Sequence, residues 1–209
     1  MKKQLVVALI ICLVFGSVGC SSTKPIDQPV KIEPIDTLTQ QSPTPVPTGE
    51  QGGIDVDKGI FNVTLTIPAD FIGEDITQQK CDDVASEKGY KSVILNTDGS
   101  VRYVMSNAQH NSMMDELSES ISKGLSDMVA SGDYPNFVSI KPSDDFTKFT
   151  VTITSEELNL VDSISVLQLY IYGGMYNAFN GTPADNITVS FVNETSGKII
   201  HEANSRDMK

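Results

Sequence analysis

Thiols, imidazoles and carboxylates are the groups from which a chain usually builds a reactive site, and here the first two are scarce. The sequence has three cysteines and two histidines, His110 and His201. Neither histidine lies in a His-Glu-x-x-His motif, and Cys-x-x-Cys, Gly-x-Ser-x-Gly and phosphate-binding glycine motifs are absent from the sequence. We therefore expect both histidines to be ordinary surface residues.

The carboxylates that come in pairs are adjacent, at Asp82-Asp83, Asp144-Asp145 and Glu156-Glu157. Glycosidase chemistry needs two carboxylates held across a cleft, so we expect these pairs to be solvated surface positions. Residues 55–59 faintly resemble a calcium loop, but the glycine is one place early and Thr66 stands where the bidentate glutamate belongs. We interpret this segment as a polar lead-in to a strand. No metal or other cofactor is predicted.

Cys20 is the cysteine whose surroundings indicate chemistry. Lys2 and Lys3 precede an apolar run over residues 5–15, and the small-residue segment 16–19 leads directly to the cysteine. A basic head, a short apolar middle and a small-residue neck are typical of a secretory signal. The run of about eleven apolar residues is too short for a bilayer span, which needs about twenty. We predict a signal peptide over residues 1–19.

The segment Ser17-Val18-Gly19-Cys20 resembles the lipobox of bacterial lipoproteins. The resemblance covers about the first 25 residues and implies a diacylglyceryl group on the Cys20 sulfur and cleavage between Gly19 and Cys20. Two or more acyl chains hold a protein stably on a membrane. The expected location is the outer side of the cytoplasmic membrane of a Gram-positive cell. The alternative is an ordinary secretory signal in which the cysteine has no special role.

The other two cysteines carry no predicted function. Cys12 leaves with the signal, so Cys81 is the only thiol of the folded part and no intramolecular disulfide can form there. It lies in a predicted helix over residues 77–88, where we expect a small buried hydrophobe.

An aromatic cluster is the one candidate ligand patch. Tyr170, Tyr172 and Tyr176 surround the pair Gly173-Gly174. Aromatic faces could stack on a sugar or a peptide. The alternative, which we favour, is a buried helix in which the glycines admit close packing by a neighbouring element.

Composition divides the rest of the chain into a tether and one domain. Six of the ten prolines lie between residues 20 and 57, among Ser, Thr, Gln and Gly, which predicts a disordered tether of about 100 Å when extended. Residues 58–209 are expected to form one domain. The full chain has 15 basic and 27 acidic residues and a net charge of −12. This balance argues against nucleic acid as a partner.

Apolar periodicity predicts the elements of that domain. Residues 60–67 alternate as a half-buried strand, and three hairpins are expected at 90–105, 137–154 and 187–203. Besides the helix at 77–88, we predict an amphipathic helix over 107–131, whose apolar stripe is Met114, Leu117, Ile121, Leu125 and Met128. A third helix should begin at Thr154 or Ser155, run to about Phe179 and be the central buried helix because it is apolar on most sides.

These elements predict an α+β fold in which antiparallel β-hairpins alternate with three helices packed on one sheet face. The folded part is similar to uncharacterised lipoproteins of Gram-positive bacteria, a resemblance that implies no activity. The hypothesis is a lipid-anchored, non-enzymatic extracytoplasmic domain. It would be joined to the membrane through Cys20 and bind a protein or envelope component. The alternative is a small cell-envelope hydrolase with an unrecognised active site.

Overall fold

The computed structural model describes residues 53–208 and contains two four-stranded sheets. Sheet A has the order β1-β2-β4-β3 and is antiparallel throughout. Sheet B has the order β5-β6-β7-β8. The strands of sheet A are β1 (Asp55–Lys58), β2 (Asn62–Ile67), β3 (Ser92–Leu95) and β4 (Val101–Ser106); those of sheet B are β5 (Phe137–Pro142), β6 (Lys148–Ile153), β7 (Thr188–Asn193) and β8 (Ile199–Asn204).

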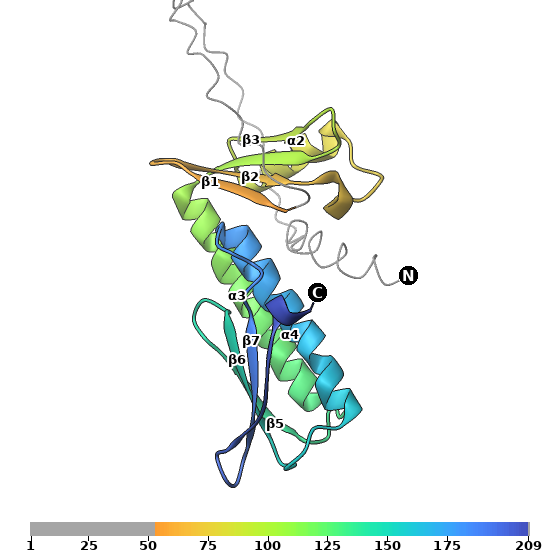
Figure 1. Cartoon of the computed structure of the whole chain (residues 1–209). Coiled ribbons are helices and arrows are strands. Elements are labelled where there is room, and N and C mark those ends of the chain that lie inside the picture. The colour runs from red at the N-terminus through yellow and green to blue at the C-terminus, as the bar shows by residue number, and fades with distance from the viewer. Residues whose placement is uncertain (1–52, 209) are drawn as a thin grey trace, which may run out of the picture.

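Three α-helices connect and cover the sheets: α2 (Gln78–Lys88), α3 (Asn107–Ala130) and α4 (Leu160–Asn180). Sheet A and α2 lie at one end of the molecule, and α3 and α4 run side by side from there along sheet B (Figure 1). The 24 residues of α3 span about 36 Å, which is enough to link the two sheets. Short 3₁₀ turns occur at Ala69–Phe71 and Ser205–Asp207.

The α+β class and the three hairpins are confirmed, but three features of the sheets were not predicted. There are two sheets rather than one, each with one face against helices. Strand β1 begins inside the segment 20–57 that was assigned to the tether and ends just beyond it at Lys58, so among the described residues the first strand begins at Asp55. Strands β6 and β7 pair in parallel, because the 21-residue helix α4 between them carries the chain back along the sheet.

Helix boundaries follow from side-chain caps. Thr77 accepts from the Lys80 amide at the start of α2. Ser106 and Gln109 form a capping box at the start of α3. The start predicted for α4 at Thr154 or Ser155 is wrong, because Asn159 supplies the cap by accepting from the Asp162 amide at 2.8 Å.

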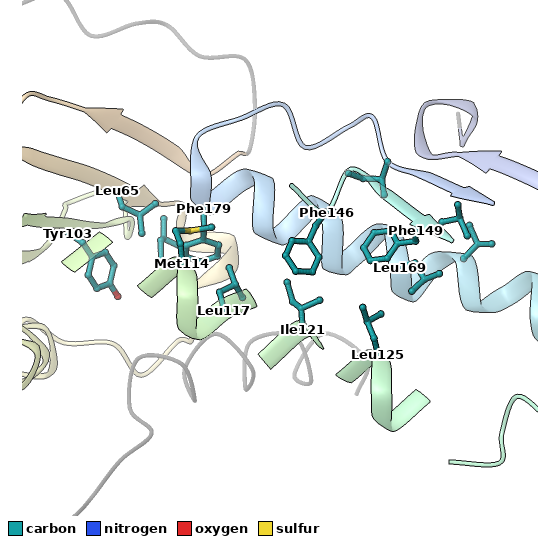
Figure 2. Close-up of a cluster of buried hydrophobic side chains, with 14 of the residues drawn as sticks. Leu65, Tyr103, Met114, Leu117, Ile121, Leu125, Phe146, Phe149, Leu169 and Phe179 are labelled. Carbon is teal, nitrogen blue, oxygen red and sulfur yellow. The ribbon is translucent and has the colours of Figure 1, made fainter. Parts of the chain in front are cut away.

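One hydrophobic core runs through the whole described part of the chain. It extends from Leu65 and Tyr103 in sheet A, along the stripe of α3, to Phe149 of sheet B and Leu169 of α4 (Figure 2). The stripe predicted on α3 is confirmed: its first four members are buried and Met128 is partly buried against the core. Burial of Tyr103 raises its pKa to about 12.

Candidate functional site

A groove of about 390 Å³ lies where the second half of α3 meets strand β5. Strand β5 is one of the two edge strands of sheet B, the other being β8, and pairs with β6 only. The residues that line the groove are Ser122, Leu125, Ser126, Val129, Val138, Ser139, Ile140 and Pro142.

Local sequence explains both walls. On α3 the lining residues recur at three- and four-residue spacing, which places Leu125 in the core and leaves Ser122 and Ser126 exposed beside it. On β5 the register shifts between Phe137 and Ser139, so Val138 lies at a bulge and is 38 % exposed. Bulges are common at sheet edges, where they re-aim a side chain.

The groove is uncharged, and its lining is a mixture of apolar and polar groups. None of its eight lining residues carries a charge. The Ser126 hydroxyl donates to the Ser122 carbonyl of its own helix at 3.0 Å, so it is already engaged. The lining therefore offers apolar contact and hydroxyl groups, and no acid–base pair.

The outer side of β5 adds backbone groups to this wall. An edge strand presents N–H and C=O groups that have no ladder partner and can pair with an added strand. Pro142 closes the strand and has no N–H to donate, which limits how far such pairing could extend. A helix wall beside an unpaired strand edge is suited to an extended peptide, whose backbone pairs with the strand and whose side chains enter the groove.

The three tyrosines of the predicted ligand patch point to different neighbours. Tyr176 packs on Phe146 with ring centroids 4.6 Å apart. The hydroxyl of Tyr172 lies against Gly124 of α3. Burial raises the pKa of Tyr170, and Asp207 raises it further. All three are half-buried in packing contacts, and none lines the groove.

The two histidines differ in their exposure to solvent. His201 is exposed on β8, as expected. The surface prediction for His110 is wrong: its side chain is buried, and its Nε2 lies 3.0 Å from the Phe179 carbonyl oxygen at the end of α4. Burial lowers the His110 pKa against the opposing effect of this hydrogen bond. The signal was present in the sequence, because His110 lies four residues before Met114 and extends the apolar stripe of α3 by one turn.

Cys81 and the carboxylate pairs lie as predicted. Cys81 is buried, and burial raises the pKa of its thiol with a further rise from Asp82. The adjacent acids at 82–83, 144–145 and 156–157 are all exposed. In residues 53–208 no group of three or more His, Cys, Asp or Glu side chains is arranged to hold a metal ion.

The carboxylate of Asp162, in the first turn of α4, is buried and was not predicted. Its side chain is fully buried; Oδ2 accepts from Asn136 Nδ2 at 3.0 Å, and Oδ1 has no hydrogen-bond partner among the described residues. Its position on the inner face of α4, one turn before the buried Ser165 and Val166, is the pattern that could have indicated its burial. A carboxylate in the first turn is also favoured by the helix dipole.

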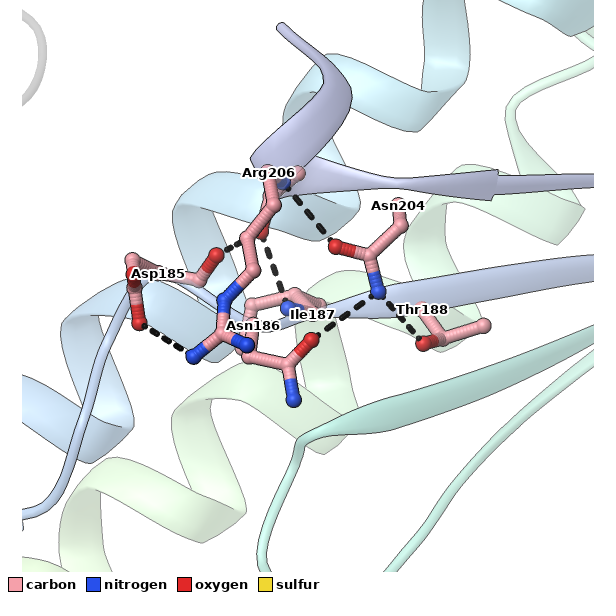
Figure 3. A network of polar contacts seen from close by, with 7 residues as sticks. Asp185, Asn186, Ile187, Thr188, Asn204 and Arg206 are labelled. Atoms are coloured by element: carbon pink, nitrogen blue, oxygen red, sulfur yellow. Dashed lines mark hydrogen bonds and ion pairs between the residues drawn. The ribbon is translucent and has the colours of Figure 1, made fainter.

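A polar network ties the segment after β8 to the start of β7 and has a structural role (Figure 3). Asn204 Nδ2 donates to Asn186 and to Thr188, both at 3.0 Å. The Ser205 hydroxyl donates to the Asp185 carbonyl at 2.7 Å and accepts from the Ile187 amide at 2.9 Å. These contacts hold the Ser205–Asp207 turn against the start of β7.

The predicted lipidation residue Cys20, the cleavage residue Gly19 and most of the tether lie outside the described residues. Among residues 53–208 no helix combines the length and apolarity needed to cross a membrane. Comparison with protein families, with curated proteins and with solved structures finds no match for this chain.

Proposed function

We propose that this protein is a lipid-anchored, non-enzymatic binding protein of the outer side of the cytoplasmic membrane. Its ligand would be an extended peptide segment of another envelope protein, held in the groove between α3 and β5. The observation that carries the proposal is an uncharged groove bounded by an unpaired sheet edge. The anchor part rests on the resemblance of Ser17-Val18-Gly19-Cys20 to a lipobox.

Charge supports a peptide over a polyanion. The chain carries a net charge of −12, whereas the groove has no charged lining residue. A nucleic acid or an anionic wall polymer would be repelled by the net negative charge of the chain as a whole. A peptide backbone needs no compensating charge, because its hydrogen-bonding groups can pair with β5 and its apolar side chains can contact Leu125 and Val129.

Metabolic labelling with a fatty acid in a lipoprotein-processing bacterium tests the anchor. Cys20→Ala should abolish the label and shift the protein from the membrane to the medium. Cys12→Ala is the matched control, because that cysteine lies in the predicted signal, and it should leave labelling unchanged. Equal labelling of the unaltered chain and Cys20→Ala would refute the anchor.

Selection of displayed peptides against the purified full chain, followed by titration of the selected peptides, tests the groove. Ser126→Trp fills the groove and should weaken peptide binding by tenfold or more. Ser112→Trp places the same side chain at an exposed position of α3 outside the groove and should leave affinity unchanged. Peptides that bind equally to both variants, or no selected peptide at all, would refute the groove assignment.

A further inference from the structure

Helix α4 carries an exposed apolar stripe in addition to its buried face. Leu160 is 76 % exposed, Ile164 53 %, and Leu167 and Ile171 are each 45 % exposed. Helices α3 and α4 lie together on one face of sheet B, so no element of residues 53–208 covers the outer side of α4 (Figure 1). Val161, also on this side, is 48 % exposed.

The spacing of the stripe is that of a two-stranded coiled coil. Its members are separated by four, three and four residues, so Ile164 and Ile171 occupy a positions and Leu160 and Leu167 occupy d positions. A β-branched residue at a with leucine at d favours two parallel strands. At the next position of this spacing, Gly174 faces the Ala184 carbonyl oxygen of the same chain, so the exposed stripe ends at Ile171.

The opposite side of α4 is already used. Val166, Leu169 and Gly173 are buried against sheet B and the loop before β6. The helix therefore has two apolar faces, and residues 53–208 bury only the inner one. A contiguous exposed apolar surface marks an interaction site.

Charge identifies the occupant as a second copy of α4. Residues 160–180 contain no Lys, Arg, His or Glu, and their single acid, Asp162, is buried. In a chain of net charge −12, this helix offers a surface on which two copies can meet without like charges of the two helices opposing each other. A membrane surface fits less well, because helices that lie on anionic lipid carry Lys or Arg on their polar face.

We infer that two copies of this protein associate through the outer faces of α4 as a parallel two-stranded pair, in which Leu160 and Leu167 each meet the same residue of the other copy. The interface is self-complementary, as a two-fold dimer requires. No stripe residue lines the groove between α3 and β5, so dimerisation and peptide binding use separate surfaces.

Cysteine crosslinking of the full chain in intact cells tests this. Leu160→Cys and Leu167→Cys, treated with a mild oxidant, should each give a disulfide-linked band of twice the mass. Ile199→Cys is the matched control, because Ile199 is 62 % exposed on β8, away from α4, and should give no more dimer than the unaltered chain. Addition of Ile164→Glu to Leu167→Cys should reduce the band at least tenfold, whereas added Ile199→Glu should leave it unchanged.

Several outcomes would overturn the inference. Failure of both α4 cysteines to crosslink, while a maleimide still labels them, would show an accessible face without a second copy. Protection from maleimide without crosslinking would show that another segment or molecule covers the face. A band of any other mass would indicate a different partner. If Leu167→Cys crosslinks and Leu160→Cys does not, the two helices pair in antiparallel orientation and the parallel pair is excluded.

Discussion

Helices α3 and α4 lie side by side on the same sheet, yet their outer surfaces differ completely. Helix α3 buries an apolar stripe and exposes charged residues, among them Asp115, Glu119 and the ion pair of Lys123 with Asp127. Helix α4 buries one apolar face and exposes another. Packing among residues 53–208 buries the apolar stripe of α3, whereas it buries only one of the two apolar faces of α4. The inferred pairing of two copies would account for this difference, because it would cover the outer face of α4.

The largest expected loss of stability comes from a substitution on the inner face of α4. Leu169→Ala removes a fully buried side chain and should lower the free energy of unfolding by about 2–5 kcal/mol. Leu167→Ala, two residues away on the outer face, should cost less than about 1 kcal/mol at protein concentrations that favour the monomer. Urea unfolding of both variants measures this. Equal losses would mean that the two faces are not distinct.

The next largest loss of stability is expected where the inner face of α4 packs too closely to admit an added side-chain atom. A Cβ at position 173 would meet the Phe146 carbonyl oxygen and Ile187, so Gly173→Ala should cost about 1–3 kcal/mol. Gly174→Ala is the matched control: its Cβ would meet only the Ala184 carbonyl oxygen at 3.4 Å, an ordinary contact. It should leave the midpoint of urea unfolding unchanged or raise it, because alanine favours helix.

The start of α4 depends on a contact that α3 does not need. Asn136→Ala removes the partner of the buried Asp162 carboxylate and should cost about 1–2 kcal/mol, within the range for an unpaired buried polar group. Asn107→Ala removes an exposed hydrogen bond from α3 to the Ile60 carbonyl and should change stability by less than about 0.5 kcal/mol. Thermal unfolding of the two variants measures the two losses. A larger loss for Asn107→Ala than for Asn136→Ala would contradict the importance assigned to the contact between Asn136 and Asp162.

The smallest effect concerns the contact between the two helices at His110. Burial lowers its pKa below the ordinary value of 6.5, so in the interval between the two values the unfolded chain binds more protons than the folded one. The stability that neutral His110 contributes is therefore complete above about pH 6.5 and is lost as pH falls through the lowered pKa.

Free energies of unfolding measured between pH 7.5 and 5 should show this loss of the His110 contribution as the pH falls. His110→Gln should flatten the profile across this interval, whereas His201→Gln, at an exposed position, should keep the slope of the unaltered protein. A His110→Gln profile with an unchanged slope would exclude His110 as the source.

Most elements of the fold could be predicted from the sequence. The alternation of apolar and polar residues predicted β2. A turn at Asn96–Gly99, in which Gly99 has a φ of 83°, joins β3 to β4 as expected. Helix α3 was predicted to within a residue of its end. These successes share a cause, since the periodicity and turn chemistry that specify such elements lie within a few consecutive residues.

The candidate site could not be predicted in the same way. The groove combines Ser122 and Ser126 with Val138 and Ile140, and no local pattern says that α3 will lie beside that strand edge. The parallel pairing of β6 with β7 is also a contact between segments far apart in the chain. Alternation identifies a strand and its buried face, but neighbours in a sheet are selected by the total surface that the assembled chain buries.

The sequence by itself determined the elements, the acidic balance and the predicted lipid attachment at Cys20, because each depends on a short segment or on a sum over residues. Tertiary structure alone decided that there are two sheets, that β6 and β7 pair in parallel, and which apolar face of α4 is exposed. A helix that is apolar on most sides looks the same in sequence whether it is surrounded or covered on one side only. The difference depends on neighbours contributed by distant segments of the chain.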